Sequence, residues 1–234
     1  MTQITDRLDQ LRVQIATAAE HAKRQPQSIN LLAVSKTRQA DELRQAWSAR
    51  QRDFGENYLQ EALDKIDALS DLDICWHFIG PIQSNKTRPI AENFSWVHSV
   101  DRFKVAQRLN DQRPASLPPL NICLQVNISE EASKSGVLPA ELTALATEVA
   151  SLPNIRLRGL MAIPASDADP QRQRAPFAQL NALLQGLQQQ LPNTPLDTLS
   201  MGMSGDMEAA ILEGATIVRI GTALFGPRDY SQQQ

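Results

Sequence analysis

The chain has 234 residues, a formal net charge of −3 and only 5% aromatic residues. This length is sufficient for one large hydrophobic core, and we expect a single domain over residues 1–234. The mild acidity gives no reason to expect nucleic acid or a membrane surface as a partner. Because we find no signal peptide and no membrane-spanning apolar run, we expect a cytoplasmic protein in which Cys75 and Cys123 are reduced core residues.

The predicted elements alternate between helices and strands along the whole chain. Residues 2–24 have apolar side chains at helical spacing, which predicts an amphipathic helix. Short apolar runs predict strands over 29–37, 52–57, 74–80, 96–100, 121–127, 155–163, 196–202 and 216–221. Helices are predicted over 40–50, 58–69, 85–93, 102–111, 139–151, 177–191 and 206–213. The stretch 164–176 is predicted to be a long polar loop.

Strict alternation of buried strands with helices predicts a parallel sheet. Eight such repeats in 234 residues favour closure into a barrel over an open, doubly wound sheet. No G-x-G-x-x-G pattern follows the first strand, which weakens the dinucleotide-binding alternative. We therefore expect an α/β fold, a (β/α)8 TIM barrel preceded by an extra helix.

A single lysine, Lys36, follows the apolar run of the first strand. Burial disfavours the charged ammonium group, so a lysine at the mouth of a buried strand tends to have a lowered pKa. The neutral amine is a nucleophile that forms Schiff bases with carbonyl compounds. The competing interpretation is a lysine that has left the strand and extends its ammonium group into water.

Polar residues recur where the predicted strands end, which in such barrels is the face that carries the chemistry. Each has an ordinary structural alternative: Asn57 could cap the next helix, and His77 could be a satisfied core histidine. Their convergence on one rim is the functional signal. The residues at these strand ends are Lys36, Asn57, His77, Asn127, Met161, 200–204 and 219–222.

The loops after strands seven and eight resemble a phosphate site. Gly202, Ser204 and Gly205 stand just before a predicted helix, where backbone N–H groups, a hydroxyl and the helix N-terminus favour an anion. Gly221 and Thr222 offer the same chemistry after strand eight. Strand alternation places Arg219 on the same side as Gly221, where its guanidinium could meet a ring nitrogen or a carboxylate.

A Schiff-base lysine beside a phosphate site indicates a ligand that carries both an aldehyde and a phosphate. Pyridoxal 5′-phosphate (PLP) has both groups. A class I aldolase acting on a sugar phosphate would need the same two features, so the residues alone leave both possibilities open.

Long motifs across the chain resemble the YggS/PROSC-type pyridoxal phosphate homeostasis proteins. These motifs are LLAVSKT, FGENYLQE, WHFIGPIQSNK, NISEEASKSG, RGLMAIP, SMGMSGDMEAAI and VRIGTALFG, spread over residues 29–230. The resemblance implies the barrel of the alanine racemase N-terminal domain. It further implies that Lys36 forms a Schiff base with PLP and that Ser204, Gly221 and Thr222 bind the phosphate. It also implies that Arg219 faces the pyridine nitrogen and that Asn57, His77, Ser200 and Met201 line the cofactor.

The resemblance also suggests a PLP carrier without catalytic residues. In alanine racemase a second domain brings the other catalytic base, and we expect no such domain here. A cation beside the ring nitrogen also disfavours its protonation and weakens the cofactor as an electron sink. We expect a monomer without bound metal, and PLP-dependent apo-enzymes as partners that receive PLP from it. The alternatives are a racemase-like PLP enzyme that uses His77 as its acid/base partner, and the aldolase, which would be colourless.

Overall fold

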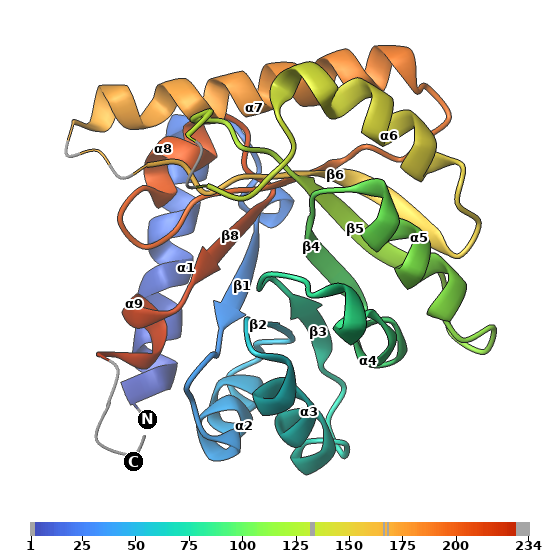
Figure 1. The fold of residues 1–234 in the computed structure, drawn as a ribbon. Coiled ribbons are helices and arrows are strands. Elements are labelled where there is room, and N and C mark those ends of the chain that lie inside the picture. Colours follow the sequence, from blue (N-terminus) through green and yellow to red (C-terminus); the bar gives the residue numbers. More distant parts are fainter. Residues whose placement is uncertain (1–2, 132–133, 166, 168, 228–234) are drawn as a thin grey trace.

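A computed structural model describes residues 3–131, 134–165, 167 and 169–227 of the chain. Its strands are all parallel and form a closed barrel in chain order, in which β1 is hydrogen-bonded to both β2 and β8 (Figure 1). The barrel confirms the predicted (β/α)8 fold. The strands are β1 (Asn30–Val34), β2 (Asp53–Glu56), β3 (Cys75–Phe78), β4 (Trp96–Val100), β5 (Leu120–Gln125), β6 (Ile155–Met161), β7 (Thr198–Ser200) and β8 (Ile217–Ile220).

Helices surround the strands on the outside of the barrel (Figure 1). The extra helix α1 (Gln3–His21) buries one apolar face and packs against α2, α8 and α9. The other α-helices are α2 (Ala40–Ser48), α3 (Leu59–Ala68), α4 (Thr87–Asn93), α5 (Phe103–Gln112), α6 (Leu142–Ala150), α7 (Pro170–Gln190), α8 (Met207–Leu212) and α9 (Thr222–Phe225). Short 3-10 turns cover Pro26–Ser28, Ser84–Lys86 and Pro139–Glu141.

The barrel interior is closely packed and contains both apolar and polar side chains. In β1, Leu31, Leu32 and Ala33 are all buried, as expected for a strand covered on both sides. Strands β6 and β7 approach each other so closely that a Cβ atom on Gly159 would lie 1.8 Å from the carbonyl oxygen of Thr198. Only glycine fits at that position.

The sequence prediction was wrong for part of the segment 164–176, because α7 already begins at Pro170. Proline is tolerated in the first turn of a helix. The start of α7 was missed because this polar stretch shows no apolar residues at helical spacing. An ion pair between Arg174 and Glu213 ties this turn to the end of α8. Helix α9 was also missed, since four residues are too few for a periodic pattern.

Some of the predictions reach beyond the part of the chain that the structure describes. Residues 166 and 168 of the expected loop, and residues 1–2 and 228–234 of the expected domain, lie outside the described residues. Within the described residues, no helix is both long enough and apolar enough to cross a membrane.

Candidate functional site

A cavity of about 310 Å³ opens at the carboxyl ends of the barrel strands. Several residues predicted from the sequence to bind a ligand line it together: Lys36, Asn57, Ser204, Arg219, Gly221 and Thr222. The remaining lining residues are Val34, Ile79, Ile163, Met203 and Gly205. The fold therefore brings the predicted lysine, arginine and glycine-rich loops to one place, although they are far apart in the sequence.

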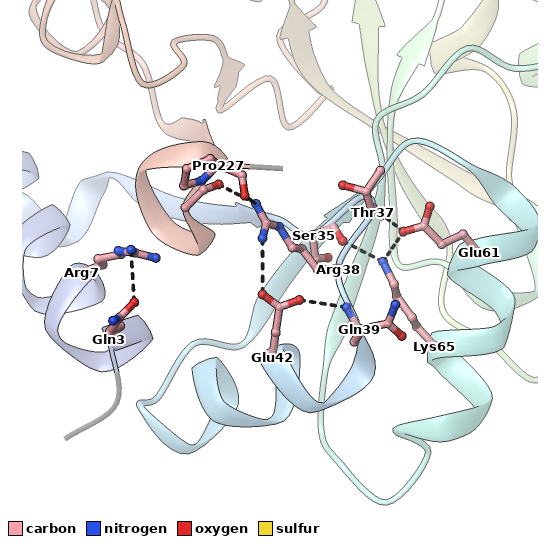
Figure 2. Close-up of polar contacts among 11 residues, drawn as sticks. Gln3, Arg7, Ser35, Thr37, Arg38, Gln39, Glu42, Glu61, Lys65 and Pro227 are labelled. Carbon is pink, nitrogen blue, oxygen red and sulfur yellow. Dashed lines mark hydrogen bonds and ion pairs between the residues drawn. The ribbon is translucent and has the colours of Figure 1, made fainter. Parts of the chain in front are cut away.

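The loop that carries Lys36 is held by hydrogen bonds to the two peptide groups on either side of this residue. Lys65 on α3 donates from Nζ to the carbonyl oxygen of Ser35 over 2.7 Å. Glu61 accepts the backbone N–H of Thr37 over 2.5 Å. Figure 2 shows both contacts, with Glu61 and Lys65 on the same side of the loop. The backbone of Lys36 is thus fixed from α3 while its side chain lines the cavity.

A buried carboxylate, Glu56, lies beneath this loop. Its Oε1 accepts hydrogen bonds from Ser35 Oγ over 2.6 Å and from Lys65 Nζ over 2.8 Å. The Glu56 side chain is fully buried, and that burial raises the pKa of its carboxyl group against the opposing effect of Lys65. Neither Glu56 nor Lys65 was singled out from the sequence. For Lys65, its spacing from Glu61 on a helix usually indicates an ion pair on the solvated surface.

Arg38 connects the Lys36 loop to the end of the barrel. It donates from Nη2 to the carbonyl oxygens of Gly226 and Pro227, over 2.5 Å and 3.0 Å, and pairs with Glu42 (Figure 2). Its guanidinium also lies 5.7 Å from the centre of the Phe225 ring. These contacts hold the loop after β1 against the segment that follows Gly221 and Thr222.

Arg219 on β8 is a buried cation whose hydrogen bonds all go to neutral oxygens. It donates to the carbonyl oxygen and hydroxyl of Ser200 over 2.5 Å and 2.9 Å, and to the carbonyl oxygen of Ala162 over 2.9 Å. Burial lowers the pKa of Arg219 to about 10, so the guanidinium stays charged at neutral pH. A buried positive charge at a cavity wall favours an electron-rich ligand group there.

The loop after β7 contributes two glycines as well as Met203 and Ser204 to the region of the cavity. Gly202 has a φ of +93°, and a Cβ atom there would lie 2.6 Å from the Cβ of Ala210, so the turn requires glycine. A Cβ on Gly205 would meet no atom within 4 Å. The exposed Ser204 lies between these glycines, and the loop leaves room for a ligand beside its backbone.

Three of the residues that the resemblance implies at the cofactor do not line the cavity: His77, Ser200 and Met201. The strand-end residues Asn127, Met161 and Gly202 do not line it either. His77 is 1% exposed and Met201 is fully buried. The His77 ring contacts Asp53 and His98, and Ser200 contacts Arg219 from below the cavity. Their expected role as cofactor-lining residues stays a prediction.

Asp53 and His98 were missed by the sequence analysis. Asp53 is the first residue of β2 and therefore lies at the opposite end of the strand from Asn57. His98 is in the middle of β4, and burial holds its pKa well below 6.5. Neither position carried a local signal, because the pairing of β3 with β2 and with β4 is what places both beside His77.

The chain matches the family model for the alanine racemase N-terminal domain over residues 7–229. It is 63% identical over 230 residues to a pyridoxal phosphate homeostasis protein of Pseudomonas aeruginosa, covering 98% of both chains. It is 54% identical over 236 residues to the Escherichia coli K12 protein of the same name, covering 100% of both chains.

Solved structures show the same similarity. PipY of Synechococcus elongatus without PLP is 42% identical, with a TM-score of 0.87 over 96% of this chain and all of PipY (100%). PipY with PLP bound is 41% identical, with a TM-score of 0.85 and the same coverage. Alanine racemase from Corynebacterium glutamicum, at 17% identity and a TM-score of 0.65, shares the barrel fold. With these similarities along its whole barrel, the chain belongs to the family of pyridoxal phosphate homeostasis proteins, which has the fold of the alanine racemase N-terminal domain.

Proposed function

We propose that this protein binds PLP as a Schiff base on Lys36 and serves intracellular PLP homeostasis without catalytic turnover. The observation that carries the proposal is the composition of the cavity wall. Among the described residues that line it, Lys36 is the one nucleophilic amine and Arg219 the one other charged group. No histidine, cysteine, tyrosine or carboxylate is among those lining residues.

The residues present fit the chemical groups of PLP. Lys36 supplies an amine for the aldehyde, and Ser204, Gly221 and Thr222 supply hydroxyl and backbone N–H groups for the phosphate. Arg219 supplies a fixed cation toward the ring. Asn57 has a buried amide oxygen without a hydrogen-bond partner, as expected where a ligand completes the wall. The PLP-bound PipY structure supports this ligand.

The same wall supports a carrier rather than a racemase. Racemisation requires acid/base groups on both faces of the substrate, and among the described residues of the cavity wall only Lys36 offers one. His77, the candidate for the second group, is buried and bonded to Asp53 and His98. The names of the similar Pseudomonas and Escherichia proteins also indicate homeostasis.

Further parts of the proposal concern the state of the protein in the cell. We infer a cytoplasmic monomer that holds the reactive aldehyde and releases it to PLP-dependent apo-enzymes. No metal is required for this function, because the ligand is bound through an amine, a guanidinium, hydroxyl groups and the backbone.

Reductive trapping tests the proposal directly. The purified protein, loaded with PLP and freed of unbound PLP, should absorb in the visible range, lose that band on borohydride reduction and yield a modified peptide that contains Lys36. Lys36→Ala should yield no reduced adduct, whereas Lys104→Ala, at an exposed position on α5, should behave like the wild type. A colourless purified protein, or an adduct on another lysine in Lys36→Ala, would contradict the proposal.

A further inference from the structure

A continuous series of hydrogen bonds runs through the barrel interior beneath the cavity. Arg219 Nη1 lies 2.9 Å from Ser200 Oγ, which lies 2.7 Å from His98 Nδ1. His98 Nε2 lies 2.9 Å from His77 Nδ1, and His77 Nε2 lies 2.9 Å from Asp53 Oδ1. We call these five residues the Asp53–Arg219 network. They come from five different strands, and the series ends at the opposite mouth of the barrel.

The network is rigid and largely sealed from water. The side chains of Ser200, His98 and His77 are at most 1% exposed, while the carboxylate of Asp53 is 23% exposed. The ring of Trp96 stacks on His77, with 5.5 Å between the ring centres and an angle of 4° between the planes. The stacked indole and the surrounding core restrict the rotation of the His77 ring, whose Nε2 has Cys75 Sγ as a second, weaker neighbour at 3.4 Å.

The chemistry of the two ends fixes the direction of every hydrogen bond. A guanidinium can only donate and a carboxylate can only accept. His77 must therefore carry its proton on Nε2 to donate to Asp53, which leaves its Nδ1 to accept from His98 Nε2–H. His98 Nδ1 then accepts the hydroxyl proton of Ser200, whose oxygen accepts from Arg219.

The opposite direction of these hydrogen bonds is unfavourable unless one of the two imidazoles carries an additional proton. If His98 donated from Nδ1 to Ser200, then His77 would have to donate from Nδ1 to His98. The bare Nε2 of His77 would then face the carboxylate oxygen of Asp53 at 2.9 Å, and two acceptors would repel each other. A protonated imidazole would avoid this repulsion, but burial lowers the pKa of His77 and disfavours that state.

We propose that Asp53, His77, His98 and Ser200 are positioning residues that order this network and thereby fix the guanidinium of Arg219 toward the ligand in the cavity. The part of this inference that concerns PLP rests on the proposed function. The order of protons in the network is a property of the protein itself.

A metal ion is a competing explanation for part of the network, since Asp53, Cys75 and His77 present their ligand atoms within 4.8 Å of one another. The nitrogen that would bind the metal is His77 Nε2, which must carry a proton in the ordered network. The depression at this mouth is also lined by Arg12, Arg50 and Arg52, whose charges disfavour a cation. Hydrogen bonding therefore accounts for this cluster better than metal binding does.

The first test reads the protons directly by nitrogen NMR of protein labelled in its imidazole rings. The chain has only three histidines, and the exposed His21 serves as an internal reference. At pH 7.5 we expect His77 and His98 to be neutral, both protonated on Nε2. A proton on Nδ1 of either ring, or a charged imidazolium, would overturn the proposed order.

The second test asks whether Asp53 sets the order at a distance. In Asp53→Ala the acceptor is lost, so both orders become accessible. The nitrogen signals of His98 should then shift, although Asp53 is hydrogen-bonded to His77 and not to His98. Asp73→Ala, which removes an exposed carboxylate beside Arg52, is the matched control and should leave both rings unchanged. A change confined to His77 would overturn the coupling.

The third test is a double-mutant cycle on PLP affinity. His98→Leu should weaken PLP binding about three- to tenfold when Arg219 is present, the effect of one lost hydrogen bond. It should have less than about a twofold effect in an Arg219→Lys background, because effects that act through one group are not additive. His98→Asn, whose amide can still accept from Ser200, should recover part of the loss. Equal losses in both backgrounds would overturn the positioning role.

The tests separate this inference from the proposed function. A wild-type protein that fails to bind PLP would refute the proposed function, while the NMR experiments would still decide the proton order. If His98→Leu does not fold, the partly exposed Asp53→Ala replaces it in the cycle with the same expectations.

Discussion

Lys65 Nζ lies 2.7 Å from the carbonyl oxygen of Ser35, so a lysine on α3 holds the peptide group that precedes Lys36. The same ammonium group lies 2.8 Å from Glu56 and 2.5 Å from Glu61. One buried cation therefore neutralises a buried carboxylate and fixes the loop that carries the reactive amine.

Removal of this cation should destabilise the protein strongly. Lys65→Met leaves the carboxylate of Glu56 buried without its partner, which typically costs about 3–5 kcal/mol of unfolding free energy. Denaturant unfolding measures the loss. Lys104→Met, at an exposed position, should change the unfolding free energy by less than about 0.5 kcal/mol. The interpretation is wrong if the two variants are equally stable, and Glu56→Gln should restore part of the stability of Lys65→Met.

The phosphate of PLP should contribute much of its affinity. Hydrogen bonds to a charged group are worth about 1.5–3 kcal/mol each, so pyridoxal should bind far more weakly than PLP. Because a ligand that binds only the native state raises its stability, PLP should raise the melting temperature more than pyridoxal does.

Variants at the cavity should reduce this difference. Ser204→Ala combined with Thr222→Val should lower the melting-temperature shift with PLP, since both hydroxyl-bearing residues line the cavity. Ser70→Ala combined with Thr143→Val, at exposed positions elsewhere, provides the matched control. Equal shifts with pyridoxal and PLP in the wild type would refute a phosphate site here.

Amino acids should not be processed faster than by free PLP. The described cavity wall has no acid/base group besides Lys36, and the cation of Arg219 disfavours protonation of the ring nitrogen. Exchange of the α-proton in heavy water, measured with L- and D-alanine among other amino acids, tests this expectation. Exchange well above the rate with free PLP, abolished by His77→Ala, would instead identify an enzyme.

The two buried histidines should make the protein less stable in mild acid. Burial lowers the pKa of both His77 and His98, so the folded protein keeps them neutral while the unfolded chain takes up protons below pH 6.5. Their contribution to stability is therefore complete above pH 6.5 and is lost as the pH falls through the pKa values of the folded state. Each histidine should add up to about 1.4 kcal/mol per pH unit to the slope of the unfolding free energy against pH.

Unfolding free energies between pH 7.5 and 5.5 test this slope. The values for His98→Gln should fall less steeply with decreasing pH than those for the wild type, because one of the two buried titrating groups is gone. Parallel curves for the wild type and His98→Gln would show that His98 does not titrate on unfolding.

The sequence by itself determined the repeating architecture and much of the candidate site. Apolar runs alternate with helical patterns, which is sufficient to identify a parallel barrel, and the structure confirms it. Because the carboxyl ends of the strands meet at one rim of such a barrel, the residues at these ends were expected to form one site. Six of them line one cavity: Lys36, Asn57, Ser204, Arg219, Gly221 and Thr222. These positions were predictable because each stands next to a strand end that local pattern reveals.

Only the tertiary structure decided what lies beneath that cavity. Whether His77 faces the ligand or Asp53 depends on how strands of different length are aligned around the barrel, and no local pattern records that register. The same holds for Lys65, whose helical spacing to Glu61 resembles a solvated surface pair until α3 packs it under the Lys36 loop. A buried charge or imidazole is stable only where the folded protein supplies its hydrogen bonds. The partners of these residues are therefore determined by the tertiary structure and not by the local sequence.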